Sequence, residues 1–338
     1  MSEVLVHVTR GNYIESRHHG DLAVVDRDGK LLYAVGDPYR FTFWRSAAKP
    51  FQMAPFVEGG GIEHFQIEPH ELALMTSSHG GEAKHVATLR GILHKIGCTE
   101  EQLDCGIAPP MHSKTAAEIL RGGDRYEAVH NPCSGKHAAM LALGKLLHLP
   151  MENYLHPHHP IQQIMLDTVA QCCHMKPEDM AVAIDGCGVP VFGMDISKMA
   201  LAYARFSKPE GYFSQKRITA LRTILAAMTN NPFYVAGTDR LDTALMEATR
   251  GRIVAKLGAE AVYSVGIVNQ GIGICLKIDD GAYRAIGPVI IEVLKRLDLI
   301  TEEELKKLED YWKPKLKNHR QEIIGELQPV FAFQRQSS

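Results

Sequence analysis

Two serine–lysine pairs in this sequence have the residue types that acyl-transfer chemistry needs. The first pair lies in RSAAKP at residues 45–50, where Ser46 and Lys49 are three positions apart. Residues at i and i+3 share one face of a helix, so Lys49 is expected beside Ser46. A partly desolvated lysine has a lowered pKa, and its neutral amine can take the serine proton. The pattern predicts an S-x-x-K nucleophile; the alternative is a helix-capping serine beside a solvated lysine.

Pro50 indicates where the helix that carries this pair begins. Proline is tolerated only near the start of a helix, so Ser46 is expected at or next to a helix N-terminus. The helix macrodipole there favours an alkoxide and a developing oxyanion.

The second pair is formed by Ser78, in TSSHG at residues 76–80, and Lys256, in RIVAKLG at residues 252–258. S-x-x-K enzymes carry a second lysine box, K-T-G, on a strand that lines the pocket. Leu257 replaces the threonine here. A helix cap and a surface lysine before a turn are the alternative explanations.

A candidate metal site comes from two further segments. NPCSGKH at residues 131–137 opens an expected helix, and DGCG at residues 185–188 follows an expected buried strand. Thiolates and a carboxylate from different elements could converge on zinc, which accepts both kinds of ligand. Lys136 lies one turn from Cys133 and could join them, although lysine is an unusual ligand because its amine must first lose a proton. The alternative is that the cysteines are free thiols.

Strands are expected at both ends of the chain and helices between them. The N-terminal strands cover residues 4–8 and 21–36, with a hairpin turn at residues 26–29. Apolar residues at helical spacing predict helices at about 46–57, 69–76, 82–96, 113–121, 134–148, 160–174, 195–206, 214–229 and 240–249. The C-terminal third predicts consecutive strands, a hairpin at residues 279–281, a helix over PVIIEVLKRLDL, and a capping box at Thr301.

This order predicts an α+β fold rather than a parallel α/β fold, because strand and helix do not alternate regularly. We expect an antiparallel sheet built from the N- and C-terminal segments and flanked by helices, with a helical region inserted. Residues 1–338 form one catalytic unit in this interpretation, with a mixed sheet lobe of 1–60 plus 250–338 and a mainly helical lobe of 61–249.

Composition excludes several classes of protein. The chain has 37 Lys plus Arg against 39 Asp plus Glu, so it lacks the basic excess of a nucleic-acid-binding protein. A hydrophobic share of 45% excludes global disorder. No apolar run approaches the roughly 20 residues needed to cross a membrane, and the first residues lack the pattern of a signal peptide. We therefore expect a cytoplasmic protein.

The motifs RSAAKP, TSSHG, NPCSGKH, DGCGVP and IVAKLG, in this order, resemble the bacterial L-asparaginase family typified by the inducible Rhizobium enzyme. The resemblance spans about residues 5 to 335. It implies hydrolysis of asparagine to aspartate and ammonia, a fold similar to serine β-lactamases and penicillin-binding proteins, and a homodimer. It also implies a bound Zn²⁺ that is structural or orients the substrate and is not obligatory for the chemistry.

The resemblance further implies a role for each matching position. Ser46 with Lys49 and Ser78 with Lys256 match two catalytic tandems, and which serine attacks stays open. Arg45 is a candidate partner for the substrate carboxylate, and His137, which adjoins the metal ligands, is a candidate substrate-binding residue. Asp242 stands where characterised members carry cysteine, close to the expected substrate site. The implied zinc ligands are Cys133, Lys136, Asp185 and Cys187.

Three other functions remain compatible with these residues. The first is a general amidase or glutaminase, and the second is a cytoplasmic β-lactamase-like hydrolase. The third is a zinc-containing binding protein without turnover.

Overall fold

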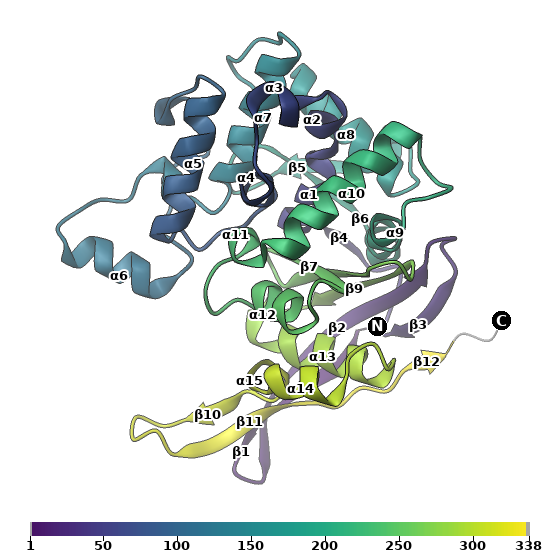
Figure 1. Ribbon diagram of the computed structural model, residues 1–338. Helices are drawn as coiled ribbons and strands as arrows, with labels where there is room; N and C mark the ends of the chain where they lie inside the picture. Colours follow the sequence, from purple (N-terminus) through teal and green to yellow (C-terminus); the bar gives the residue numbers. More distant parts are fainter. Residues whose placement is uncertain (1, 336–338) are drawn as a thin grey trace. The chain divides into compact units, whose positions relative to one another are not determined.

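The computed structural model describes residues 2–335, which divide into two compact units (Figure 1). The first unit comprises Met1–Ala47, Met194–Lys208 and Ala244–Ser338. The second comprises Ala48–Gly193 and Pro209–Thr243. Each unit therefore contains residues that are distant in the sequence.

The first unit is built on one antiparallel sheet. Its strands are β1 (Glu3–Arg10), β2 (Tyr13–Asp26), β3 (Leu31–Val35), β7 (Ile253–Gly258), β8 (Val262–Ile267), β9 (Ile272–Ile278), β10 (Lys315–Lys317), β11 (Ile323–Pro329) and β12 (Gln334–Arg335). The strand order is β10-β11-β1-β2-β9-β8-β7, and β3 also pairs with β2 and with β12. N-terminal strands thus pair with C-terminal strands at two places, β1 with β11 and β2 with β9.

Helices pack on this sheet. They are α9 (Ile196–Ser207) and α13 (Ile286–Arg296); α15 (Glu309–Trp312) packs on α13 and on α14 (Glu302–Lys307). Helix α9 lies on β2, β8 and β9, and its backbone approaches so closely that a Cβ atom on Gly273 would lie 1.9 Å from Ala200 O. Only glycine at position 273 permits this contact. The unit also contains β4 (Phe41–Phe43) and short 3-10 helices at Arg45–Ala48 and Tyr283–Ala285.

The second unit is mainly helical. Its helices are α1 (Lys49–Gln52), α2 (Ala54–Glu58), α3 (Gly61–Phe65), α4 (Pro69–Met75), α5 (Ala83–Lys95), α6 (Ser113–Arg121), α7 (Ser134–Leu146), α8 (Pro160–Cys172), α10 (Gln215–Asn230) and α11 (Pro232–Val235). Short 3-10 helices lie at Glu100–Gln102, Ala128–His130 and Pro177–Asp179, and β5 (Ala181–Ile184) pairs with β6 (Pro190–Asp195). Helix α7 is central, since residues 134–144 are all buried. Helix α12 (Leu241–Ala248) spans the boundary between the two units.

The predicted α+β class with an antiparallel sheet made from both ends of the chain is confirmed. The predicted turn at residues 26–29 does join β2 to β3, with Gly29 at φ 89°. The capping box at Thr301 is also present, since Thr301 Oγ1 accepts from Glu304 N at 3.2 Å.

Four local predictions were wrong. Residues 279–281 do not form a hairpin but lead from β9 to a 3-10 helix and α13. The helix expected over 46–57 is broken into a 3-10 turn, α1 and α2, because Pro50 and Pro55 each start a new segment. Strand β5 is not buried, since Val182 and Ile184 are exposed. Strand β2 begins at Tyr13 rather than at residue 21. The polar residues of its first half lack the apolar pattern from which strands were predicted.

The two units have different boundaries from the predicted lobes. The sequence placed the boundaries near residues 60 and 250 and assigned α9 to the helical lobe, whereas residues 194–208 lie in the first unit of the structure. No helix within residues 2–335 is long and apolar enough to span a membrane.

Candidate active site

Ser46 lies in a short, firmly held segment of the first unit. The 3-10 helix Arg45–Ala48 carries it, and Arg45 adopts a left-handed conformation with φ 54°. That conformation costs a residue with a side chain roughly 1–2 kcal/mol, and such strain is concentrated at functional sites. Trp44 Nε1 donates to Ser264 Oγ at 3.0 Å, and Tyr203 OH donates to Ala47 O at 2.8 Å. Hydrogen bonds on both sides therefore fix the backbone around Ser46.

Strand β7 brings Lys256 to the same part of the first unit. At the end of this strand, a Cβ atom on Gly258 would lie 2.6 Å from Trp44 O and 3.4 Å from Ala47 N. The strand therefore packs against the backbone of the Ser46 segment. Lys256 is buried, and its Nζ donates to Leu257 O at 3.0 Å. The first unit thus places two of the four predicted catalytic residues on contacting segments.

We expect the substitution Gly258→Ala to lower the free energy of unfolding by about 1–3 kcal/mol, because the added methyl group must displace the Trp44 carbonyl. Urea unfolding measures the effect. Gly91→Ala, in α5, is the matched control: its Cβ would meet nothing closer than 3.8 Å, and alanine is the better helix former. Equal stability of the Gly258→Ala variant and the unsubstituted protein would contradict the tight packing.

Lys49 and Ser78 meet in the second unit. Lys49, the first residue of α1, is buried, and its Nζ donates to Ser77 O at 2.5 Å and lies 3.0 Å from Ser78 Oγ. Burial lowers the pKa of Lys49, and the charge of Lys136 lowers it further, against the opposing influence of Cys133 and Cys187. The neutral amine has a lone pair that can accept a proton from a hydroxyl group.

The loop between α4 and α5, which carries Ser78, is anchored at several points. Ser78 N donates to Val235 O at 3.0 Å, so this N–H group is already used and is a poor candidate for an oxyanion donor. Gly81 N donates to His79 Nδ1 at 3.1 Å, which leaves the proton on Nε2, 2.8 Å from Ser134 Oγ. Burial lowers the pKa of His79 well below its ordinary value, so the ring is neutral. His79 thus attaches the loop to α7.

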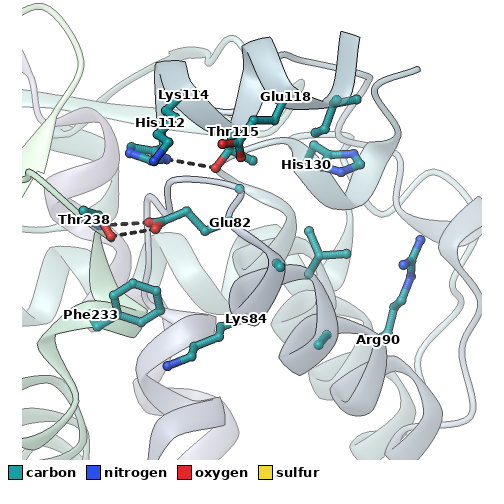
Figure 2. A pocket seen from close by; sticks show the side chains of 15 residues that line it. Glu82, Lys84, Arg90, His112, Lys114, Thr115, Glu118, His130, Phe233 and Thr238 are labelled. Atoms are coloured by element: carbon teal, nitrogen blue, oxygen red, sulfur yellow. Dashed lines mark hydrogen bonds between the residues drawn. The ribbon is translucent and has the colours of Figure 1, made fainter. Parts of the chain in front are cut away.

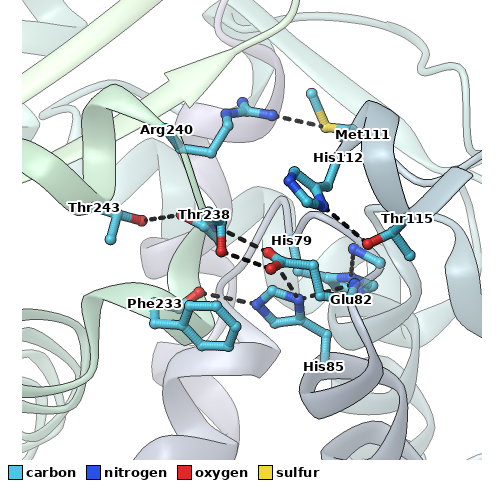
Figure 3. Close-up of polar contacts among 12 residues, drawn as sticks. His79, Glu82, His85, Met111, His112, Thr115, Phe233, Thr238, Arg240 and Thr243 are labelled. Atoms are coloured by element: carbon cyan, nitrogen blue, oxygen red, sulfur yellow. Dashed lines mark hydrogen bonds and ion pairs between the residues drawn. The ribbon is translucent and has the colours of Figure 1, made fainter. Parts of the chain in front are cut away.

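Glu82 attaches the same loop to residues 233–238 (Figure 3). Its two carboxylate oxygens accept hydrogen bonds from Thr238 N at 2.8 Å and Thr238 Oγ1 at 2.6 Å. His85 Nε2 adds a hydrogen bond to Phe233 O at 2.9 Å. A Cβ atom on Gly237 would lie 2.5 Å from Glu82 Oε1, so glycine is required there. Sequence reasoning missed Glu82 and Thr238, although Glu82 lies only two residues beyond TSSHG.

A cleft of about 920 Å³ lies beside this attachment (Figure 2). It is lined by the start of α5, by α6 and by residues 233–238, and it includes Glu82, His112 and Phe233. His112 Nδ1 lies 2.8 Å from Thr115 Oγ1, and His112 N donates to Gly80 O at 3.0 Å in the loop that carries Glu82. None of the predicted catalytic or metal-ligating residues lines this cleft.

Cys133, Lys136 and Cys187 form a cluster in the second unit, in which Lys136 and Cys187 are buried and Cys133 is half-buried. Lys136 Nζ lies 3.2 Å from Cys187 Sγ. A hydrogen bond from Cys187 and the charges of Lys49 and Lys136 hold the pKa of Cys133 well below its ordinary value, although burial opposes them. Burial lowers the pKa of Lys136, but the sulfur atoms of Cys187 and Cys133 outweigh it and raise that pKa. The cluster therefore favours a charged Lys136 and the deprotonated form of Cys133 rather than of Cys187.

The structure places three of the four implied zinc ligands in this cluster, and the charge of the fourth, Asp185, acts on Cys133 and Lys136. Two cysteine sulfurs and an amine are donors that suit zinc, and all three lie in the cluster just described. Asp185 lies in the β5–β6 turn, where its Oδ1 accepts from Gly186 N at 2.8 Å. Within residues 2–335, no three His, Cys, Asp or Glu side chains are arranged to hold a metal ion. The donor types fit zinc, and three of the four donors adjoin one another.

The remaining predicted residues also have defined places. His137 is buried on α7 next to Lys136, and its Nδ1 lies 2.6 Å from Tyr154 OH. Asp242 is buried in the first turn of α12. Arg45, Ser46 and Lys256 belong to the first unit, whereas the other predicted site residues belong to the second.

Comparison with known proteins gives one family match. The family model described as L-asparaginase II matches residues 6–329. No curated protein matches the sequence. Similar solved structures include a candidate β-lactamase from Bacteroides dorei DSM 17855, with 13% identity over 82% of this chain and 93% of that chain at a TM-score of 0.44. A β-lactamase from Mycobacterium bovis is 12% identical over 86% of this chain and 94% of that chain, at a TM-score of 0.38. These TM-scores are too low to support a fold assignment. The assignment rests instead on the strands and helices described above.

Proposed function

Since the chain belongs to the L-asparaginase II family and is an asparaginase-type hydrolase, we propose that it hydrolyses L-asparagine to L-aspartate and ammonia. The observation that carries the proposal is the buried Lys49 amine, 3.0 Å from Ser78 Oγ and in the segment that follows Ser46. A neutral lysine beside a serine hydroxyl is the proton acceptor that serine nucleophiles of this kind need.

The proposed reaction has two stages. Ser46 Oγ attacks the side-chain amide carbon, and the neutral amine of Lys49 takes the serine proton. Ser78 and Lys256 pass protons to the departing ammonia, which leaves a β-aspartyl ester on Ser46. Water then hydrolyses the ester and releases aspartate. Backbone N–H groups stabilise the oxyanion, and the one at Ser46 is a candidate donor.

Ammonia release from L-asparagine tests this proposal directly. The purified protein is incubated with asparagine, and ammonia and aspartate are measured together. Equal amounts of both products support the proposal, and a folded protein that releases neither would overturn it. A β-lactam tested in parallel, with mass spectrometry to detect a covalent adduct, distinguishes a β-lactamase-like hydrolase.

We expect asparagine to be hydrolysed with a higher specificity constant than glutamine. The two side chains differ by one methylene group, which packing alone distinguishes by about 1–3 kcal/mol. With the carboxylate held by Arg45 and the ammonium group near Asp242, the longer side chain carries its amide carbon past Ser46. Turnover of glutamine should therefore fall as well as binding. Steady-state kinetics with asparagine and with glutamine test this preference. Equal specificity constants would favour a general amidase.

We also propose a zinc ion held by Cys133, Lys136, Asp185 and Cys187. With four protein ligands, the metal would have no open position for water, so it would shape the pocket or hold the substrate. Zinc binding requires the lysine amine to lose its proton, so the present contact between Lys136 Nζ and Cys187 Sγ would be replaced by bonds to the metal.

Elemental analysis should find one zinc ion per chain in protein purified without chelators. We expect the substitution Cys133→Ser to abolish zinc retention, because oxygen is a poor substitute for the thiolate. Cys98→Ser is the control: Cys98 is a buried cysteine outside the cluster, and its Sγ donates to Ile96 O at 3.9 Å. Absence of zinc from the unsubstituted protein would contradict this prediction.

The predicted homodimer and the predicted cytoplasmic location stay predictions. Neither is required by the chemistry proposed for the residues above.

A further inference from the structure

A buried relay of polar groups ends on His137. Asp104 N donates to Tyr154 OH at 3.1 Å, and Tyr154 OH lies 2.6 Å from His137 Nδ1. Tyr154 is 3% exposed and His137 is fully buried. The backbone carbonyl of Tyr154 accepts a hydrogen bond from Gln162 Nε2 at 2.8 Å, which holds the tyrosine in place from α8.

These contacts determine where the protons lie. A tyrosine hydroxyl has one proton to donate. If His137 Nδ1 carried a proton and donated it to Tyr154, the tyrosine oxygen would accept twice and its own proton would have no acceptor. A buried donor without an acceptor costs about 1–3 kcal/mol. Tyr154 therefore donates to Nδ1, and the ring proton of the neutral imidazole lies on Nε2.

The other side of the His137 ring is unsatisfied. Nε2 is buried and has no hydrogen-bond partner within the described residues. Because Nε2 carries the proton, this atom is a donor that needs an acceptor, and the described residues supply none. A buried donor of this kind needs an acceptor oxygen. That oxygen belongs either to a bound ligand or to a water molecule that occupies the place until the ligand binds.

We propose that Tyr154 is a positioning residue: it holds His137 in the Nε2–H tautomer, so that Nε2 donates a hydrogen bond to an oxygen atom of the bound substrate. The tautomer follows from the relay alone. The identity of the oxygen, in an amide or a carboxylate, rests on the proposed hydrolysis of asparagine.

Nitrogen NMR of protein with ¹⁵N-labelled histidine tests the tautomer without any substrate. The resonances of His137 are assigned from the spectrum of a His137→Asn variant. We expect a protonated Nε2 and an unprotonated Nδ1 in the unsubstituted protein and in a Tyr126→Phe control. Tyr126 is the matched residue because its hydroxyl donates to the carbonyl of Ala116 and contacts no histidine. The Tyr154→Phe variant should show both tautomers, since Nδ1 has lost its partner.

Steady-state kinetics of the same variants test the link to the substrate. We expect Tyr154→Phe to lower kcat/KM for asparagine about tenfold, which is typical for loss of a group that orients another site residue. Tyr126→Phe should keep the activity of the unsubstituted protein. A purely structural role for Tyr154 would lower the melting temperature but leave the His137 tautomer unchanged.

The outcomes are distinct. A protonated Nδ1 in the unsubstituted protein, or a single unchanged tautomer in Tyr154→Phe, would overturn the proposal. An Nε2–H tautomer that responds to Tyr154→Phe in a protein that does not hydrolyse asparagine would support the positioning role and overturn the asparaginase assignment instead. If asparagine is hydrolysed and Tyr154→Phe leaves kcat/KM unchanged, the contact of His137 with the substrate is overturned.

Discussion

Replacing Ser46 by alanine is expected to reduce the turnover of asparagine by about 10³–10⁶-fold, while the protein stays folded. Removing a nucleophile removes the covalent step, and losses of this size are found for other serine hydrolases. Ser46 is only partly buried, so alanine leaves no cavity of consequence. Ammonia release under saturating asparagine measures the turnover, and circular dichroism checks the fold.

The matching substitution Ser78→Ala shows which serine attacks. If Ser46 is the nucleophile and Ser78 passes protons, Ser78→Ala should lower turnover about 10²–10⁴-fold, as loss of a proton-transferring group does. Mass spectrometry of protein quenched during turnover should find the aspartyl ester on Ser46. More than about a tenth of the original activity in Ser46→Ala would assign the nucleophile to another residue, and Ser78 would be the next candidate because it contacts Lys49.

Replacing Lys49 by arginine or by methionine should also reduce turnover by at least about 10³-fold. Arginine keeps a positive charge but cannot be deprotonated, so it cannot act as a base. Methionine keeps the length of the side chain without charge or proton affinity. Loss of activity in both variants would show that proton transfer, rather than charge alone, is needed.

Lys145→Met is the control for the Lys49 variants. Lys145 is an exposed residue at the end of α7 whose Nζ contacts the carbonyl of Gly97, so this variant should keep full activity. If Lys49→Arg retained the activity of the unsubstituted protein, Lys49 would act through its charge and a different base would be required.

Short motifs in the sequence were enough to find the candidate residues but not their partners. The pattern S-x-x-K suggested that Lys49 serves Ser46, because the two residues are three positions apart. The structure places Lys49 Nζ next to Ser78 Oγ, 29 residues away in the chain, and packs the Ser46 segment against β7. Spacing along the sequence predicts neighbours within one helix, whereas these contacts depend on how separate elements pack.

Most elements with an apolar face were predicted, although the buried strand β6 was missed, and elements rich in polar residues were predicted poorly. The buried strands β7, β8 and β9 and the amphipathic helix α13 were found from their apolar residues. The first half of β2 and all of β10 are rich in polar residues, since much of their surface is exposed, and they were missed. The sequence Asp279-Asp280-Gly281 has hairpin residues, yet a turn of this kind can equally lead into a helix, and the local residues do not distinguish the two.

The pairing of β1 with β11 has a consequence for how the chain is made. Val8 lies opposite Leu327, so β1 is synthesised more than 300 residues before the strand with which it pairs. Until then β1 has an unpaired edge, which is a template for association with other chains. Contacts of such high sequence separation also slow folding. A chain that ends before β11 would keep every proposed catalytic residue and still expose that edge, so truncation at the C-terminus should yield aggregated rather than merely inactive protein.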